Sequence, residues 1–382
     1  MTYKDLYVLI PSHSLEDFPT ELGDRPAEGL LNAWSVLWHP ALVAAADDIP
    51  HWHRADDPPS LLAGRLVVVP PACDSMVTSE WINTAREAGM AIVSGVHERS
   101  ALISAVLEPL DEKPDVPADL VADFIAFGHL HLQTELLTRH MRQFGNIDDD
   151  RLRNDATAAA RAAVAGDESA CRTHLKHCFE MLLESREKFY PVSCYLIDLC
   201  LTIPRLAGEP LGHVLDDDTP VNLMGTAEDL AEIVAAHPEY QSTIRDRWQA
   251  GTLEIIGGEW AERCSTLLPL DAQVHELDRG RKVLRELFGK APSTWGRRRY
   301  GLTPLVPQLL KRSNYHGALH FVMDDGVYPD EEFAKLLWQG ADGATIASYS
   351  RIPIAGDSAS AFLRFPVRMA ESMDHDYVVG LV

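Results

Sequence analysis

The sequence predicts an α/β protein, built either as a β/α barrel or as a doubly wound sheet. Short apolar runs of strand length alternate with helical patterns along most of the chain. These runs are almost continuously hydrophobic, which is typical of parallel strands buried on both faces. With 382 residues, 46% of them hydrophobic, the chain can bury a large core. One barrel-sized domain fits that length as well as two smaller domains do.

Seven apolar runs are predicted to be strands. In the second half of the chain, three helical patterns lie between the predicted strands. The strands cover residues 6–10, 66–69, 91–94, 192–201, 221–224, 253–256 and 318–322. The helices of the second half cover residues 228–236, 238–250 and 273–288.

A helical block interrupts this alternation, with helices predicted at residues 120–144, 151–165 and 168–189. We therefore expect a helical excursion over residues 118–189, inserted in a single barrel domain that spans residues 1–382. The acidic, proline-containing stretch 111–117 is the best candidate for a linker. The chain stops inside an apparent strand at residues 377–382, so we expect later carboxy-terminal domains to be missing from it.

Charge and composition narrow the classes of partner. A net charge of −23 argues against binding nucleic acid or an anionic membrane through bulk electrostatics. No stretch reaches the roughly 20 apolar residues that span a bilayer, and residues 1–13 lack the pattern of a signal peptide. The six cysteines are dispersed, mostly within apolar runs, as expected of reduced core thiols. These features predict a cytoplasmic protein without a nucleic-acid or membrane partner.

Three blocks of the second half carry the most specific pattern. They read Gly251-Thr-Leu-Glu-Ile-Ile-Gly-Gly-Glu-Trp-Ala-Glu262, Trp295-Gly-Arg-Arg-Arg-Tyr-Gly-Leu-Thr-Pro-Leu-Val-Pro-Gln308 and Trp338-Gln-Gly-Ala-Asp-Gly343. In order and spacing they resemble the amino-terminal catalytic domain of the glycoside hydrolase family 38 α-mannosidases. That family typically shows Gly-Gly-x-Trp-x-Glu-Pro-Asp, then Trp-x-Pro-Asp-x-Phe-Gly running into Leu-Pro-Gln, then Trp-x-Gly-x-Asp-Gly. The resemblance implies a seven-stranded barrel, (β/α)7, of the glycoside hydrolase/deacetylase type and a carbohydrate ligand.

The sequence departs from the family at the residues that carry its chemistry. Aligned on Tyr300-Gly301 and Pro307-Gln308, the family's nucleophilic and zinc-binding Asp falls on Arg298. A retaining glycosidase needs two carboxyl groups roughly 5 Å apart, and a guanidinium cannot attack an anomeric carbon. Glu262 keeps the acidic position of the family's Glu-Pro-Asp and is the candidate acid/base, together with Asp325. An equally open interpretation is that Glu262 orders its loop by pairing with an arginine.

The arginine run Arg297-Arg298-Arg299 permits two interpretations. Because arginine matches a carboxylate or phosphate with two parallel hydrogen bonds, the run is a candidate clamp for an anionic sugar. The run is also a candidate for a structural network with Glu259, Glu262 and Asp325. Glu259, Glu262 and Asp325 follow predicted strands, and the arginine run follows Thr294-Trp295. We expect all of them to gather with His13 at the carboxyl ends of the strands of a barrel.

Zinc is the metal that the resemblance implies, and the ligands left for it are His13 with Glu16 or Asp17. The family places a His-x-Asp pair after its first strand, whereas here the carboxylates lie three and four residues after the histidine. Zinc needs about four ligands in fixed geometry, and Arg298 replaces one of them. The alternative is a polar loop in which Asp17 caps the following helix.

Further side chains are candidates for sugar contacts or for metal binding. Trp260, Trp295 and Tyr300 are expected to stack on a sugar ring, and Asp342 belongs to the third block of the resemblance. The pattern Cys171-x-x-His174-x-x-His177-Cys178 has metal-ligand spacing. On a helix, however, its thiols share an apolar stripe with Leu175 and Leu182, so we expect core packing there. His131 and Glu135 share a helix face, and we expect a partly buried pair.

Three functions follow from these residues. The first is an α-mannosidase-like hydrolase of mannose metabolism with a rebuilt mechanism. The second is a non-catalytic carbohydrate-binding barrel, and the third is a binder of an anionic sugar through Arg297–Arg299. The orientation of Arg298 relative to Glu262 discriminates among them, because an internal ion pair favours the second and an open guanidinium favours the third.

Overall fold

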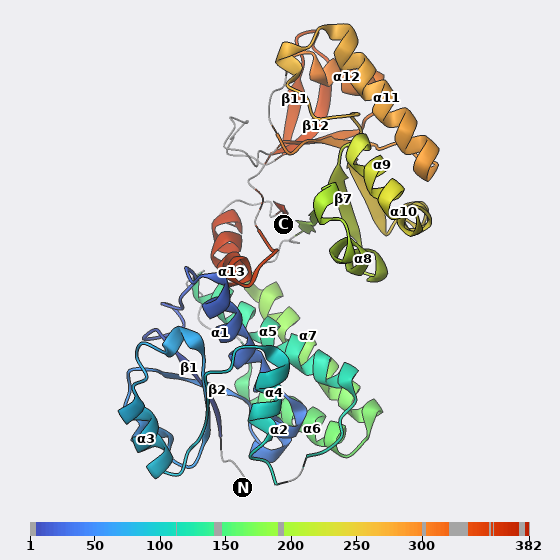
Figure 1. Ribbon diagram of the computed structural model, residues 1–382. Helices are drawn as coiled ribbons and strands as arrows, with labels where there is room; N and C mark the ends of the chain where they lie inside the picture. The colour runs from blue at the N-terminus through green and yellow to red at the C-terminus, as the bar shows by residue number, and fades with distance from the viewer. Residues whose placement is uncertain are drawn as a thin grey trace. The chain divides into compact units, whose positions relative to one another are not determined.

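A computed structural model describes residues 5–111, 113–140, 147–189, 195–299, 303–320, 335–350, 353, 355–373 and 379–381. The chain divides into two compact units (Figure 1). Unit 1 comprises Met1–Ser193 and Ala355–Asp376, and unit 2 comprises Cys194–Ile354 and Tyr377–Val382. Residues that we predicted to form one barrel domain thus fall into two units, and the α/β class is confirmed in both.

Unit 1 is built on a parallel sheet of four strands. They are β1 (Leu6–Ile10), β2 (His51–Arg54), β3 (Leu66–Val69) and β4 (Ala91–Ser94), in the order β2-β1-β3-β4. From β1 the chain proceeds first to one side and then to the other, as it does in doubly wound sheets. Unit 1 therefore has the second of the two predicted arrangements.

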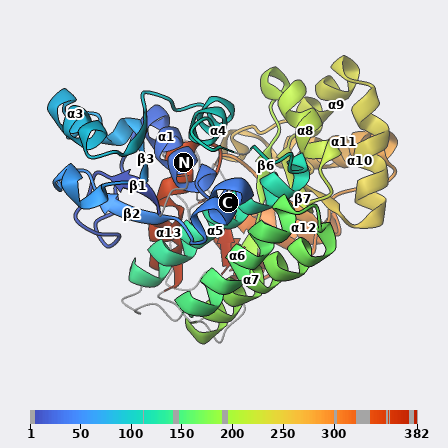
Figure 2. The same ribbon diagram turned by 90° about the horizontal axis from the view of Figure 1, so that it is seen from below.

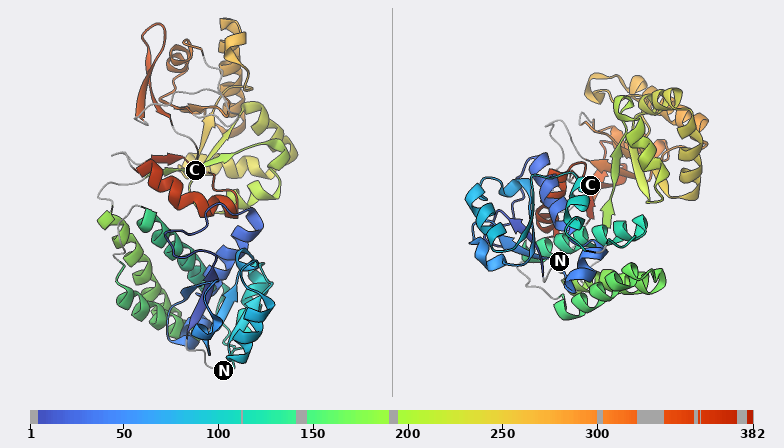
Figure 3. Two further views of the ribbon diagram at one scale, coloured as in Figure 1. Left: turned by 90° about the vertical axis from the view of Figure 1, so that its left-hand side faces the viewer. Right: turned by 60° about the horizontal axis from the view of Figure 1, so that its bottom comes forward.

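Alternate residues of these strands are buried on opposite faces of the sheet, as the period of two requires. Val8 packs into the large helical core, whereas the next residue, Leu9, packs with Val67 on the other face. In Figure 3 the blue strands of unit 1 accordingly run between two groups of helices. The nearly continuous hydrophobicity of the strands is explained by burial on both sides.

The helices of unit 1 confirm the predicted helical block and place it in the main core. Residues from α5, α6 and α7 pack with β1 in one apolar cluster, so the block covers the sheet. Figure 2 shows α6 and α7 next to each other. The helices are α1 (Asp24–Val36), α2 (Pro40–Ala46), α3 (Ser79–Glu87), α4 (Arg99–Leu107), α5 (Ala118–His140), α6 (Asp149–Val164), α7 (Glu168–Phe189) and α13 (Ala359–Met373).

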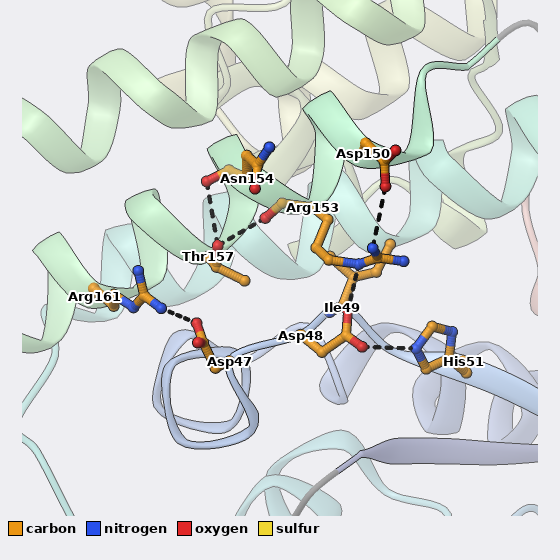
Figure 4. Close-up of polar contacts among 9 residues, drawn as sticks. All are labelled: Asp47, Asp48, Ile49, His51, Asp150, Arg153, Asn154, Thr157 and Arg161. Atoms are coloured by element: carbon orange, nitrogen blue, oxygen red, sulfur yellow. Dashed lines mark hydrogen bonds and ion pairs between the residues drawn. The ribbon is translucent and has the colours of Figure 1, made fainter.

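A polar network fastens α6 to the turn between α2 and β2 (Figure 4). Nε of Arg153 donates to Oδ1 of Asp48 at 2.8 Å, and the other carboxylate oxygen of Asp48 lies 3.3 Å from Nε2 of His51. Arg161, two turns further along α6, pairs with Asp47. These ion pairs hold a loop of the sheet layer against the helical layer, in addition to the apolar core.

Unit 2 contains a seven-stranded sheet in the order β11-β12-β10-β9-β8-β7-β6. All its pairings are parallel except that of β11 with β12. The strands are β6 (Leu199–Leu201), β7 (Val221–Gly225), β8 (Leu253–Gly257), β9 (Thr294–Gly296), β10 (Gly317–His320), β11 (Lys335–Gln339) and β12 (Thr345–Ser350). A separate parallel pair joins β5 (Tyr195–Ile197) to β13 (Val379–Leu381).

The parallel strands of unit 2 follow one another in chain order, which is how β/α barrels are built. In the described residues the sheet is open between β6 and β11, so a closed seven-stranded barrel is not seen. Helices cover one face, where Leu223 and Ile255 are buried, while Met224 and Ile256 face the other side. The helices are α8 (Glu209–Asp216), α9 (Ala227–Ala236), α10 (Glu239–Ala250), α11 (Leu270–Phe288) and α12 (Val306–Arg312).

Several boundaries differ from the predicted ones. The predicted strand at 192–201 is two strands, β5 and β6, with residues 192–194 outside the described ones. Residues 113–117 precede α5 within unit 1, so the predicted linker does not separate the two units, and residue 112 lies outside the described residues. The tails of the predictions at 141–144 and 321–322 also lie outside the described residues. Among the helices that the structure describes, none has the length and apolar character to cross a bilayer.

A close approach of α11 to the loop after β8 gives a first test. A Cβ atom on Gly280 would overlap the backbone of Gly258, Glu259 and Trp260. We expect Gly280→Ala to destabilise the protein by about 1–3 kcal/mol, although the same change at an open helix position is stabilising. The matched control is Gly317→Ala, whose Cβ would have its nearest neighbour at 3.7 Å. Urea unfolding measures both, and a stabilised Gly280→Ala would contradict this packing.

Candidate functional site

The loops that follow β6, β7, β8 and β9 surround a hollow of about 570 Å³ in unit 2. These loops leave the carboxyl ends of parallel strands, which is where α/β proteins bind ligands. The lining residues are Leu201, Ile203, Thr226, Glu228, Asp229, Ala261, Glu262, Arg298 and Arg299.

The Gly-Gly turn at the end of β8 directs the acidic loop toward this hollow. Gly257 and Gly258 have φ angles of 139° and 117°, which other residues rarely adopt. The hydroxyl of Tyr315 donates to the carbonyl of Gly257 at 3.0 Å, and a Cβ on Gly258 would overlap that hydroxyl. The two glycines are therefore needed to let the chain turn against the buried tyrosine.

Arg298 lies between two carboxylates at the hollow. Its backbone N–H donates to Oε1 of Glu262 at 3.0 Å, and its Nε lies 3.3 Å from the same oxygen. Its Nη2 donates to Oδ2 of Asp229 at 2.8 Å. The side chain of Arg298 is 20% exposed and that of Glu262 only 9%. The predicted pairing of Glu262 with an arginine is thus present in the structure.

Arg297 points away from Arg298, as alternate residues at a strand end do. Its side chain is 2% exposed, and its Nε lies 3.4 Å from Oε2 of Glu259. Its guanidinium also donates to Oγ of Ser265 at 3.1 Å and to the carbonyl of Arg263. Arg299 is exposed and lines the hollow. The three arginines therefore occupy three different environments and do not form one cationic surface.

The carboxyl group of Glu259 has a raised pKa because it is largely removed from water. Burial raises the pKa of its carboxyl group to about 7, although the charge of Arg297 opposes this shift. The neighbouring carboxylates of Glu262 and Glu276 add to the increase. Glu259 therefore exchanges a proton near neutral pH while facing a buried guanidinium.

Other predicted sugar contacts lie elsewhere. Trp295 is 1% exposed and packs in the core with Trp338, so its ring offers no surface to a ligand. One face of Trp260 is covered by the guanidinium of Arg279 at 3.6 Å. Asp342 is exposed in the turn before β12, where it accepts from the amide of Ala344, and it does not line the hollow. Tyr300 and Asp325 lie outside the described residues.

The predicted zinc ligands belong to unit 1 and pair with different residues. His13 lies 3.9 Å from Asp56, and Glu16 lies 3.4 Å from Arg139. Asp17 is exposed and does not cap α1, whose N-cap is Gly23. In the described part of the chain, none of the three joins a group of potential metal ligands. This donor set does not fit a zinc ion. That the loop containing His13 lies close to Arg297–Arg299 stays a prediction.

Asp229 is a site residue that the sequence reasoning missed. Thr226 and Asp229 form a capping box at the start of α9, with each side chain accepting from the other's backbone N–H. The signal was a Thr-x-x-Asp pattern directly after the predicted strand 221–224. The capping box fixes the carboxylate that Arg298 contacts.

The ion pairs of Arg298 predict a loss of stability when the cation is removed. Arg298→Met leaves two largely buried carboxylates without their partner, so we expect it to lower the free energy of unfolding by about 2–3 kcal/mol. Arg285→Met, at an exposed position of α11, is the matched control and should change it by about 0.5 kcal/mol at most. Urea unfolding at neutral pH distinguishes them, and equal stabilities would show that the pairs contribute nothing.

The raised pKa of Glu259 predicts a pH dependence of stability. Between about pH 4.5 and 7 the folded protein keeps a proton that the unfolded chain releases. The stabilisation from this group is therefore complete below about pH 4.5 and is lost as the pH rises to about 7, by up to about 3 kcal/mol. Glu259→Gln should abolish that slope, whatever its effect on overall stability. Unfolding curves across this pH range would contradict the assignment if both proteins had the same slope.

One family model matches part of the chain. Residues 223–363, less than half of the chain, match the family model described as "Glycosyl hydrolases family 38 N-terminal domain". No curated protein matches the chain.

Three solved structures show limited similarity, each with a TM-score of 0.38. A protein in the glycosyl hydrolase family 38 from Enterococcus faecalis is 17% identical over 50% of this chain and 23% of its own. An α-mannosidase from Enterococcus faecalis V583 is 18% identical over 49% of this chain and 24% of its own. The 4-α-glucanotransferase from Thermococcus litoralis is 16% identical over 50% of this chain and 32% of its own. The chain thus spans about a quarter to a third of each. The predicted resemblance to glycoside hydrolase family 38 is confirmed for residues 223–363, the segment that contains Glu262 and Arg298.

Proposed function

We propose that unit 2 is a glycoside hydrolase family 38-like domain that binds an α-linked sugar, with mannosides the first choice, without hydrolysing it. The observation that supports this is the environment of Arg298. It stands where the resemblance places the nucleophile, and it is paired with Glu262 and Asp229 at the edge of the hollow. Its inward guanidinium thus supports the predicted structural network.

The same contacts argue against the family's reaction. Hydrolysis with retention needs one carboxylate to attack the anomeric carbon and a second carboxyl group to move a proton. Arg298 cannot supply the first. Oε1 of Glu262 already accepts two N–H groups of Arg298, so this oxygen is engaged in holding the loop. Glu262 is thus better suited to position Arg298 than to protonate a leaving group.

The lining of the hollow suits a neutral sugar. Leu201 and Ile203 provide apolar surface for the C–H face of a sugar ring, and Glu228 is an exposed carboxylate that can accept from hydroxyl groups. The charge of Arg298 is matched by two carboxylates of the protein, and the side chain of Arg297 is buried against Glu259, so neither is poised for an anionic ligand.

One observation favours the anionic alternative. Arg299 is an exposed residue on the lining of the hollow, and a guanidinium can donate two hydrogen bonds to a uronate or a sugar phosphate. An active hydrolase with Glu262 as acid/base is a third outcome of the experiment below. We also propose that the strands of unit 2 close into a barrel. The proposal further includes a cytoplasmic location and no nucleic-acid or membrane partner.

The proposal predicts sugar binding without turnover. Calorimetric titration should show methyl α-mannoside binding to the wild-type protein, and Glu228→Ala should weaken binding by about tenfold, the usual effect of losing a hydrogen bond to a charged group. Glu232→Ala is the matched control, because Glu232 is exposed one turn further along α9 and does not line the hollow.

Hydrolysis of an aryl α-mannoside should be undetectable, because loss of a nucleophile costs several orders of magnitude in rate. Turnover that disappears in Glu262→Gln would refute the non-catalytic proposal. Tighter binding of a uronate that weakens as salt rises would favour the anionic alternative. An absence of binding to all these sugars would refute sugar binding at this hollow.

A further inference from the structure

A second group of chemically active side chains lies in unit 1, between α6 and α7. The two helices form a hairpin around the turn at Gly166 and lie next to each other (Figure 2). Asp155 on α6 faces His174 and His177 on α7. Its Oδ1 lies 2.8 Å from Nδ1 of His174 and 3.3 Å from Nδ1 of His177.

The histidines and the cysteines of this sequence pattern lie in different environments. Cys171 and Cys178 are fully buried in the apolar core, as predicted, and burial raises the pKa of Cys178 to about 12. The thiols are therefore packing residues. His174 and His177 lie on the flank of the helix and are 38% and 43% exposed. At spacing i, i+3 they project from the same side of α7.

The neighbouring cations are engaged with other carboxylates. Arg172 pairs with Asp119 and Asp123 on α5, and Arg151 lies 3.6 Å from Glu184. The partners that face Asp155 are thus two imidazoles, which can lose their protons and bind a metal ion, whereas a guanidinium could not.

The positions of the donor atoms fit a metal ion. One ligand atom from each of Asp155, His174 and His177 lies within 4.8 Å of the others. Zinc bonds of about 2.0–2.1 Å at tetrahedral angles place neighbouring ligand atoms about 3.3 Å apart. The Asp155–His177 separation of 3.3 Å already has that value. The Asp155–His174 separation of 2.8 Å would have to widen by about 0.5 Å.

We propose that Asp155, His174 and His177 form a binding site for a divalent first-row transition metal, with zinc the first choice. Two imidazoles and one carboxylate are ligands of that class, whereas magnesium and calcium prefer oxygen atoms alone. The histidines are open to solvent, so a water molecule completes the tetrahedron. The bound ion joins α6 to α7 and stabilises the helical layer of unit 1. This proposal is independent of sugar binding in unit 2.

The test uses the 382-residue chain after a chelator has removed bound metal. Calorimetric titration with zinc should give about one ion per chain, and added zinc should raise the melting temperature, because the ion binds the folded state. Cobalt should give the visible spectrum of a tetrahedral nitrogen–oxygen site. His177→Ala and Asp155→Asn should each weaken zinc binding by at least about tenfold and remove the zinc-dependent rise in melting temperature.

Two histidine controls separate this site from others. His213→Ala changes an exposed histidine of α8 that pairs with Glu209 at 3.7 Å, and it should bind zinc as the wild type does. His13→Ala tests the loop that the family resemblance indicated, and it should also leave this binding unchanged. Zinc binding that persists in His177→Ala and Asp155→Asn would overturn the proposal. The proposal is also overturned if the wild type binds no zinc while the variants are less stable than the wild type in the absence of metal. That result would show that the three residues only hold the helices together by hydrogen bonds.

Discussion

The candidate site of unit 2 depends on charge compensation inside the loops at the carboxyl ends of the strands. Two adjacent arginines leave β9 in opposite directions. Arg298 is met by the carboxylates of Glu262 and Asp229, and Arg297 faces the carboxyl group of Glu259. A guanidinium that is largely removed from water is stable only if its charge is paired and its N–H groups are bonded. The loop after β8, the start of α9 and the end of β9 are therefore fixed relative to one another by these contacts.

The charge of residue 298 decides how the two neighbouring acids can be accommodated. If an aspartate stood at position 298, it would face Glu262 and Asp229, and three carboxylates would share one small space. The arginine reverses that situation, because it neutralises both acids and ties their loops together. Arg298 therefore supplies a structural interaction that links the loop after β8 to the start of α9.

The sequence predicted the elements whose signal is local. Strand β1 and helix α7 have the predicted bounds, because a continuous apolar run and a long helical pattern are complete within their own residues. Strand β2 was missed, since His51–Arg54 has no apolar run, and its pairing with β1 is a long-range choice. The sequence did not distinguish one barrel from two units, because both arrangements use the same alternation of strands and helices.

Side-chain roles were predictable only where residue type decides them. The pairing of Glu262 with an arginine was among the predicted alternatives. The second acid that Arg298 contacts, Asp229, was not predicted, because it lies 69 residues before Arg298 in the sequence. The sequence predicts that the ring of Trp295 stacks on a sugar, but its place on a short strand buries it instead. Likewise, the pattern around His174 did not include Asp155, which the α6–α7 hairpin brings to it.

The most direct test of this account is the coupling free energy between Arg298 and Glu262, measured with a double-mutant cycle of Arg298→Met and Glu262→Gln. Urea unfolding of the wild type, the two single variants and the double variant gives the four free energies. If the ion pair organises the site, the double variant should be less destabilised than the sum of the single variants by about 1–3 kcal/mol. Additive single effects would contradict the central role of this ion pair.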